Sequence, residues 1–231
     1  MNPRCLICHE IIFTPVSWTT IFSKEKEQLV CPNCERKFEK ITGESCRICG
    51  RPLLNSFRSG DLCLDCFRWE DNPEWSGLLD RNVSLFLYND FLKEVIARFK
   101  FRGDYVLAKV FQERIKSQFD LMPFDQLVPI PLSNERLYER GFNQAEALII
   151  EAGCTPESLL TRIHSEKQSK KSRRDRIHLP QVFQISDDLD LSGQTIVLVD
   201  DIYTTGSTLR HAAKLLKQAG AIAFQSLTIA R

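Results

Sequence analysis

The segment that most limits the possible folds of this chain runs from Thr195 to Thr208 and reads TIVLVDDIYTTGST. Its apolar residues from Ile196 to Val199 predict a buried strand, which two acids, a hydroxyl-rich turn with one glycine and a helix follow. This order places charge and backbone amides at the carboxyl end of a strand, where open α/β sheets hold their ligands. The segment therefore predicts an α/β fold with a binding site at that edge.

The acids and the turn indicate which ligand this edge would take. Asp200 and Asp201 repel each other, and the vicinal hydroxyls of a ribose would offset the repulsion because carboxylates accept hydrogen bonds from them. The turn behind them starts a helix, where unsatisfied N–H groups and the helix dipole bind anions. Its residues are Thr204, Thr205, Gly206, Ser207 and Thr208. Together these features predict a site for a ribose 5-phosphate group.

Strand and helix patterns alternate from about residue 78 onward, which predicts a mainly parallel sheet flanked by helices. The residues 126–132, QLVPIPL, are apolar enough for a buried strand end, but their two prolines predict that they leave the sheet. By periodicity, strands are expected at 83–88, 195–199 and 221–230, and helices at 91–103, 105–119, 143–153 and 206–220.

Eight of the nine cysteines lie within residues 5–66 and form four Cys-x-x-Cys pairs. The pairs are Cys5/Cys8, Cys31/Cys34, Cys46/Cys49 and Cys63/Cys66. Two-residue spacing lets a tight turn direct both thiolates at one ion, and two such turns complete a tetrahedral zinc site. The spacing therefore predicts two zinc ions per chain. Sequential pairing and interleaved pairing, in which the first pair joins the third and the second joins the fourth, both stay open.

The cysteine pattern and the α/β pattern predict two domains, a zinc-binding module at residues 1–70 and an α/β domain at residues 78–231. Two tryptophans of the connector, Trp69 and Trp75, are expected to dock the module onto its neighbour. Two roles for zinc are open. The ion either only stabilises the module, or it shapes the module into a surface that binds a macromolecule. The charge does not decide between these readings, because residues 1–75 hold 10 Lys/Arg against 11 Asp/Glu.

Two other segments carry positive charge. Arg136 and Arg140 follow the predicted strand end at 126–132, where they suit a pyrophosphate group. Residues 162–176 hold seven Lys/Arg against two acids, among them Lys170, Lys171, Arg173 and Arg174. This basic stretch fits a mobile loop that closes over pyrophosphate, a contact with a nucleic-acid backbone, or a solvated loop that does neither.

The run VLVDDIYTTGST resembles the phosphoribosyl pyrophosphate (PRPP) signature of type I phosphoribosyltransferases. The resemblance implies a five-stranded, mainly parallel sheet flanked by helices, with a hood and a mobile loop over the site. It also implies that Asp200 and Asp201 hold the ribose, that Thr204 through Thr208 hold the 5′-phosphate, and that Mg²⁺ accompanies the pyrophosphate. One departure is Thr204, because purine enzymes commonly have an Asp there that contacts the base. Tyr203 offers a ring that could stack on a base.

The cysteine pairs, VPIPLSNERLYERGFNQ, QSKKSRRDR and VLVDDIYTTGSTL together resemble the ComF (ComFC) family of competence proteins, over essentially the whole chain. That family is implicated in the uptake of single-stranded DNA across the cytoplasmic membrane of bacteria, beside a DNA-translocating helicase. The resemblance implies a cytoplasmic competence factor, at most peripheral at the inner face of the membrane. Its expected ligands are PRPP or a related phosphoribosyl group, together with single-stranded DNA or a DNA-translocation partner.

The main alternative is an active phosphoribosyltransferase of nucleotide salvage, with a non-purine or unknown acceptor. A pure interaction protein with a vestigial site is a third reading, which the intact pair of acids disfavours. No nucleophile–base pair stands out, so no catalytic residue is assigned. No apolar run approaches the ~18 residues that span a bilayer, and the N-terminus lacks a secretory signal, so no membrane span is expected.

Overall fold

The computed structural model describes residues 3–13, 28–163 and 182–231. The helices are α2 (Pro32–Glu35), α3 (Leu64–Glu70), α4 (Asp90–Phe101), α5 (Gln112–Phe119), α6 (Asn134–Arg140), α7 (Gln144–Glu151) and α8 (Ser207–Gln218), with 3₁₀ helices η1 (Asn55–Phe57) and η2 (Tyr105–Val110). The strands are β1 (Arg58–Ser59), β2 (Leu62–Cys63), β3 (Arg81–Phe86), β4 (Gln126–Pro129), β5 (Thr161–Arg162), β6 (Phe183–Gln184), β7 (Thr195–Ile202) and β8 (Ala223–Ala230).

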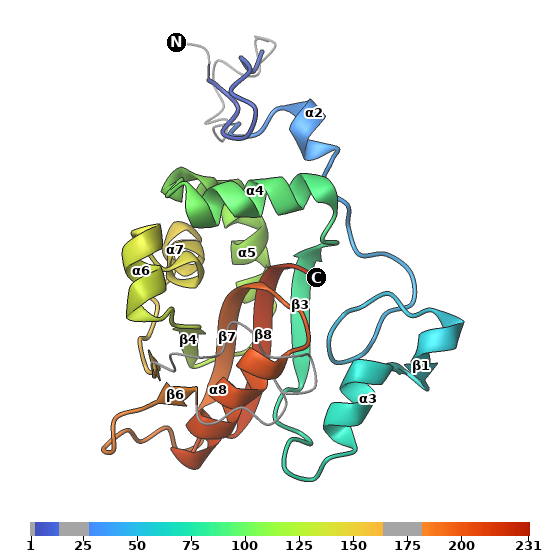
Figure 1. Cartoon of the computed structure of the whole chain (residues 1–231), viewed down its shortest axis with the longest axis vertical. Coiled ribbons are helices and arrows are strands. Elements are labelled where there is room, and N and C mark those ends of the chain that lie inside the picture. Colours follow the sequence, from blue (N-terminus) through green and yellow to red (C-terminus); the bar gives the residue numbers. More distant parts are fainter. Residues whose placement is uncertain (1–2, 14–27, 164–181) are drawn as a thin grey trace.

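The main sheet has the strand order β3-β8-β7-β4, and every neighbouring pair is parallel (Figure 1). This confirms the predicted parallel sheet flanked by helices. The resemblance implied five strands, whereas this sheet has four in the described part of the chain. Two short antiparallel pairs, β1-β2 and β5-β6, lie outside it. Because parallel strands require long crossovers, helices cover both faces of the sheet.

The first four residues of the segment with two prolines belong to the sheet, so the prediction that Pro129 leaves the sheet is wrong, whereas Pro131 lies beyond the strand. Gln126–Pro129 forms β4, which pairs with β7 at an edge of the sheet. Proline is tolerated at an edge because a strand there needs backbone partners on one side only. The ladder continues past Pro129, since the N–H of Ile130 donates to the carbonyl of Val199 at 2.9 Å.

The helices follow their expected spacing with one exception. The carboxamide oxygen of Asn89 caps α4 by accepting from the N–H of Leu92 at 2.9 Å. The apolar face of α4 is buried as the spacing predicts, with Leu92, Val95, Ile96 and Phe99 inside. The stretch 105–119 is not one helix, because a 3₁₀ segment, η2, precedes α5. Within the described ranges no helix combines the length and the apolar character that crossing a bilayer requires.

Alternation along the strands divides the apolar core into two layers. Val197 and Val199 face the layer that contains α4, α5 and α7, and Ile196 and Leu198 face the layer that contains α8. The first two cysteine pairs join the former layer, and the last two pairs join the latter. The cysteine-rich part of the chain is therefore continuous with both layers of the α/β core.

Candidate functional site

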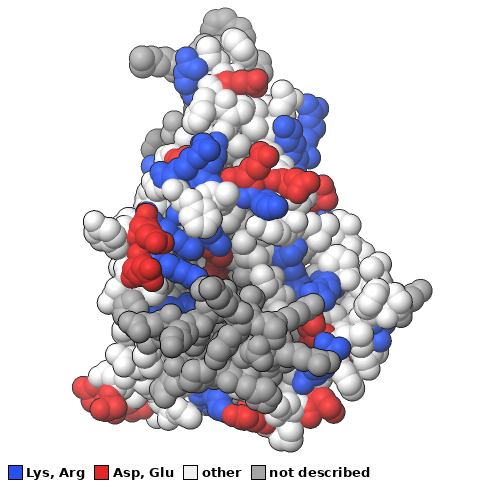
Figure 2. Space-filling view, viewed as in Figure 1, with Lys and Arg blue, Asp and Glu red and all other residues white. Residues whose placement is uncertain are grey.

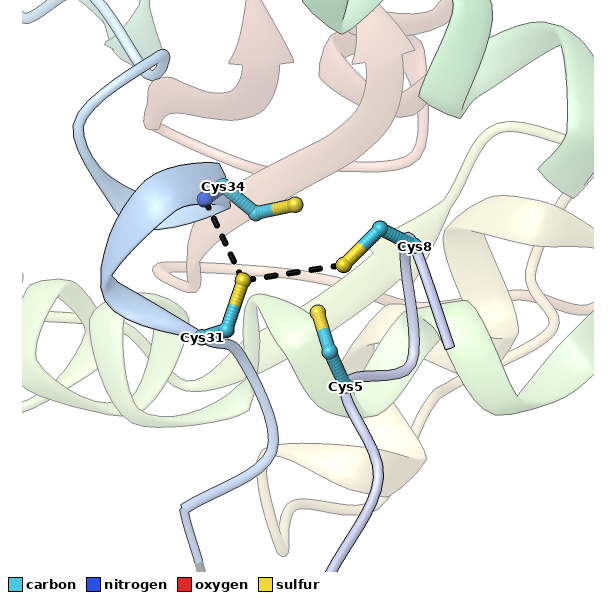
Figure 3. Close-up of side chains that lie close together, drawn as sticks. All are labelled: Cys5, Cys8, Cys31 and Cys34. Carbon is cyan, nitrogen blue, oxygen red and sulfur yellow. Dashed lines mark hydrogen bonds between the residues drawn. The ribbon is translucent and has the colours of Figure 1, made fainter. Parts of the chain in front are cut away.

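The first two cysteine pairs form one cluster, whose side chains converge on a common centre (Figure 3). The ligand atoms of Cys5, Cys8, Cys31 and Cys34 all lie within 4.8 Å of one another. The Sγ atoms of Cys8 and Cys31 are 3.6 Å apart. Tetrahedral zinc with bonds of about 2.3 Å places its sulfur ligands about 3.8 Å apart, so the geometry fits the ion. We call these four residues the first cluster.

The last two pairs form a second cluster, made of Cys46, Cys49, Cys63 and Cys66. The Sγ atoms of Cys49 and Cys63 are again 3.6 Å apart, and the N–H of Cys63 donates to the sulfur of Cys46. Each cluster therefore joins cysteine pairs that are consecutive in the sequence. Sequential pairing is confirmed, and interleaved pairing is wrong.

The two acids of the opening segment lie at the carboxyl end of β7, where the strand places successive side chains on opposite faces of the sheet. Asp201 faces α4, and its Oδ2 forms an ion pair with the Nζ of Lys100 at 2.7 Å. The carboxylate of Asp200 accepts from the backbone N–H of Asp201 at 2.9 Å. A lysine thus already offsets part of the repulsion between the two carboxylates.

Asp200 is the acid whose ionisation the surroundings oppose. Burial, and then the negative charge of Asp201, raise the pKa of Asp200 to about 7, while Lys100 and Arg162 act in the opposite direction. Asp200 therefore takes up a proton more readily than an ordinary aspartate. A ligand that brings hydroxyl donors or a cation to this carboxyl group would favour its ionised form.

A cavity of about 150 Å³ opens beside the two acids. Its charged lining consists of Lys100, Arg136, Arg140, Arg162, Asp200 and Asp201. Burial and the nearby Arg136 lower the pKa of Arg140, whose Nε is buried without a hydrogen-bond partner in the described ranges. On the face that Figure 2 shows, basic and acidic side chains lie interspersed at the level of α4 and just below it. The cavity is thus suited to a multiply charged anion that also carries hydroxyl groups.

The turn between β7 and α8 depends on glycine at one position. Gly206 has φ of 76°, in the left-handed region. A Cβ atom there would lie 2.1 Å from the hydroxyl of Tyr203 and 2.4 Å from Nη1 of Arg210, so no other residue fits without movement. Tyr203 itself is 3% exposed, which leaves its ring unavailable for stacking on a base.

The structure brings together some of the predicted site residues. Arg136, Arg140 and Thr208 line the cavity with the two acids, whereas Thr204 through Ser207 form the turn beside it. The basic residues Lys170, Lys171, Arg173 and Arg174 lie outside the described residues. Lys100 and Arg162 are site residues that the sequence analysis did not single out. A lysine near a helix end carries no local signal, because only the fold brings α4 to the end of β7.

Two domain families match this chain. Residues 1–67 match the double zinc ribbon domain, and residues 138–231 match the phosphoribosyl transferase domain. The first match agrees with the two clusters, so the predicted zinc module is confirmed. The second match covers β7, the turn and α8.

Several relatives align with most of the chain. Competence protein ComFC of Bacillus subtilis is 39% identical over 98% of this chain and 94% of that protein. Competence protein ComFC of Streptococcus pneumoniae is 32% identical over 99% of this chain and 100% of that protein. DNA utilization protein YhgH of Escherichia coli K12 is 27% identical over 87% of this chain and 90% of that protein. With its two cysteine clusters and its phosphoribosyl transferase domain, this chain belongs to the ComFC family of competence proteins.

Proposed function

We propose that the protein is a cytoplasmic competence factor that binds PRPP, or a closely related phosphoribosyl ligand, during DNA uptake. The names of its relatives, competence protein and DNA utilization protein, support the role in DNA uptake. The observation that carries the ligand is the joint lining of one cavity by Asp200, Asp201 and several basic side chains. A sugar with hydroxyl groups and phosphates needs both kinds of side chain.

Each part of the ligand has a proposed partner. The carboxylates of Asp200 and Asp201 would accept hydrogen bonds from the ribose hydroxyls. The turn at Thr204–Thr208 would take the 5′-phosphate, since its N–H groups begin α8. The basic cavity residues Lys100, Arg136, Arg140 and Arg162 would offset the charge of the pyrophosphate. Mg²⁺ would enter with the pyrophosphate, because its oxygens are the ligands that this ion prefers.

Calorimetric titration with PRPP and Mg²⁺ tests this proposal. The double variant Asp200→Asn/Asp201→Asn keeps the side-chain shape and removes both charges, and it should bind at least about tenfold more weakly, because each hydrogen bond to a charged group contributes about 1.5–3 kcal/mol. Asp187→Asn/Asp188→Asn is the matched control, since these acids are exposed and outside the cavity lining. Equal affinity in all three proteins would remove the phosphoribosyl claim.

Single-stranded DNA and a DNA-translocating helicase are the proposed partners of the competence role. The basic stretch 162–176 is the proposed contact with the DNA backbone, and residues 1–70 and 78–231 are the proposed domains. Binding of a labelled oligonucleotide should weaken steeply as salt rises, because basic side chains release counterions from the backbone. Arg173→Gln/Arg174→Gln should reduce both the affinity and the salt dependence. Salt-independent binding, or an unchanged affinity, would reject this contact.

An active phosphoribosyltransferase with a non-purine acceptor is the second candidate. The basic lining of the cavity favours it, because cations stabilise the charge that develops on departing pyrophosphate. Pyrophosphate release across a panel of bases and amines separates the two candidates. Pyrophosphate release with one acceptor would establish phosphoribosyl transfer. Binding of PRPP without pyrophosphate release for any acceptor would support the binding role alone.

A further inference from the structure

The second cluster connects to the phosphate turn, Thr204–Thr208, through a single short helix. α3 begins directly after Cys63, contains Cys66 and carries Trp69 three residues further along. The indole Nε1–H of Trp69 donates to the carbonyl of Thr205 at 2.9 Å. One helix therefore holds both a zinc ligand and a hydrogen bond to the middle of the turn.

A buried arginine lies behind the same turn. Arg210 of α8 is fully buried, and its Nη1 donates to the hydroxyl of Tyr203 at 2.9 Å. Its guanidinium carbon is 5.1 Å from the centre of the Trp69 ring, and its Nη2 is 3.8 Å from the carboxylate of Glu70. Trp69 and Glu70 both belong to α3, so this helix supplies an aromatic face and a negative charge to Arg210.

The partners of Arg210 within the described ranges do not satisfy all its donors. Its Nε and Nη2 are buried without a hydrogen-bond partner there. A buried guanidinium requires a nearby negative charge, and Glu70 at 3.8 Å is one source. Four thiolates around Zn²⁺ carry a net negative charge, so the second cluster, on the same helix, is a further source.

The turn has no room to relax toward these residues. A Cβ at Gly206 would lie within 2.4 Å of both the Tyr203 hydroxyl and the Arg210 guanidinium, so the backbone of the turn packs directly on them. The Thr205 carbonyl accepts a hydrogen bond from Trp69. Contacts with Arg210 and with Trp69 of α3 thus set the position of the turn.

We propose that the second cluster, acting through α3, holds the phosphate turn in its ligand-binding conformation, with Trp69 and Arg210 as positioning residues. This inference rests on the proposed phosphoribosyl site and names how that site is regulated. Zinc at the second cluster and a phosphoribosyl ligand at the turn then raise each other's affinity, since coupling between two sites is reciprocal. The first cluster contacts α4, which carries Lys100 of the cavity lining, and within the described residues no hydrogen bond or ion pair joins this cluster to the turn.

Trp69→Phe tests the positioning role, with Trp75→Phe as its matched control. Both variants keep an aromatic ring at a buried connector position; the ring of Trp75 packs on His211 and edge-on against Trp69, but within the described residues no hydrogen bond joins it to the turn. Trp69→Phe should weaken binding of Mg²⁺-PRPP about fivefold, the usual effect of one lost hydrogen bond, whereas Trp75→Phe should change it less than twofold. Zinc content should stay equal to that of the parent in both variants. Equal affinities in the two variants would overturn the proposal.

Hydrogen exchange gives a readout that needs no ligand. Backbone amides of residues 204–208 should exchange several-fold faster in Trp69→Phe than in the parent or in Trp75→Phe. Tyr203→Phe, which removes the hydroxyl that Arg210 bonds, should have the same effect and serves if Trp69→Phe fails to fold. Unchanged exchange in both variants would overturn the positioning role. If the parent protein binds no PRPP and residues 204–208 still exchange faster in the variants, only the proposed ligand is rejected.

Reciprocal coupling is measured from the zinc side. Release of zinc to a colorimetric chelator should slow several-fold at the second cluster when saturating Mg²⁺-PRPP is present, and the rate at the first cluster should not change. The same titration with Trp69→Phe should lose this protection. Equal protection of both clusters would show general stabilisation of the fold and would contradict a specific connection.

Discussion

The two cysteine clusters have the same ligand set and spacing, yet the molecule encloses them differently. In the first cluster Cys8 is exposed, whereas all four cysteines of the second cluster are buried. The first cluster meets the α/β domain through α4, where the guanidinium of Arg98 donates to the carbonyl of Ile7. The second cluster shares one apolar core with Trp69 and Tyr203. At the start of β3, the N–H of Asn82 donates to the carbonyl of Ile48 at 2.6 Å. Similar zinc sites can therefore be peripheral or integral to a fold.

The largest difference is expected in stability. Cys49→Ser should lower the free energy of unfolding by more than about 4 kcal/mol, because it removes a metal ligand inside the core. Cys8→Ser should cost about 1–2 kcal/mol, because water can complete the coordination at an exposed position. Denaturant unfolding with zinc analysis measures both. Cys154→Ser, outside the clusters, is the control, and equal losses at Cys8 and Cys49 would remove the distinction.

Zinc release should separate the clusters kinetically. A chelator should remove the ion from the first cluster about tenfold faster than from the second, a difference of about 1.4 kcal/mol in barrier, because it can approach the exposed Cys8 directly. Two phases are expected in the parent protein. Cys8→Ser should speed the fast phase alone, because it leaves three thiolates on that ion, and this change assigns the phase. A single phase for both ions would break the comparison.

A smaller effect is expected at the contact between α4 and the first cluster. The bond from Arg98 to the carbonyl of Ile7 links α4 to the turn between Cys5 and Cys8. Arg98 also forms an ion pair with Asp104 at 2.8 Å. Arg98→Ala should cost about 1 kcal/mol and speed the fast phase of zinc release, with no change in the slow phase. Arg102→Ala, an exposed neighbour, is the control. An effect on the slow phase would show that the clusters are not independent.

The smallest effect is a pH dependence that opposes that of the clusters. The pKa of Asp200 is raised from 3.8 to about 7. Between these two pH values the folded protein binds more protons at this group than the unfolded chain does, so the free energy of unfolding falls as pH rises. Zinc thiolates behave oppositely, since acid protonates them and releases the ion. Asp200→Asn should therefore melt above the parent, by a margin that widens from pH 5 to pH 8. A constant difference between the two proteins would contradict the raised pKa.

The sequence predicted the features that depend on local spacing. Two-residue gaps identified the eight cysteines that gather in the two clusters, and the run from Thr195 to Thr208 predicted the strand, turn and helix that the structure contains. The tryptophans were predicted to dock the zinc module onto its neighbour, and the bond from Trp69 to Thr205 confirms this. These features succeed because each motif fixes its own geometry within a few residues.

Features that depend on how distant segments meet were not predictable. Lys100 reaches Asp201 only because the crossover after β3 returns α4 to the end of β7. The strand at Gln126–Pro129 was missed because its edge position, which tolerates proline, depends on the order of the strands. Tyr203 was considered for base stacking, but its burial depends on Arg210 and Arg231, which pack against it.

The hydrogen bond from Trp69 to the Thr205 carbonyl has a practical consequence. The indole that touches the turn stacks edge-on against Trp75, with ring centres 5.3 Å apart, and the chain's other tryptophan, Trp18, is outside the described residues. Intrinsic fluorescence of this pair would respond to any displacement of the turn. The protein thus carries its own optical reporter, and stopped-flow emission could follow ligand arrival without a label.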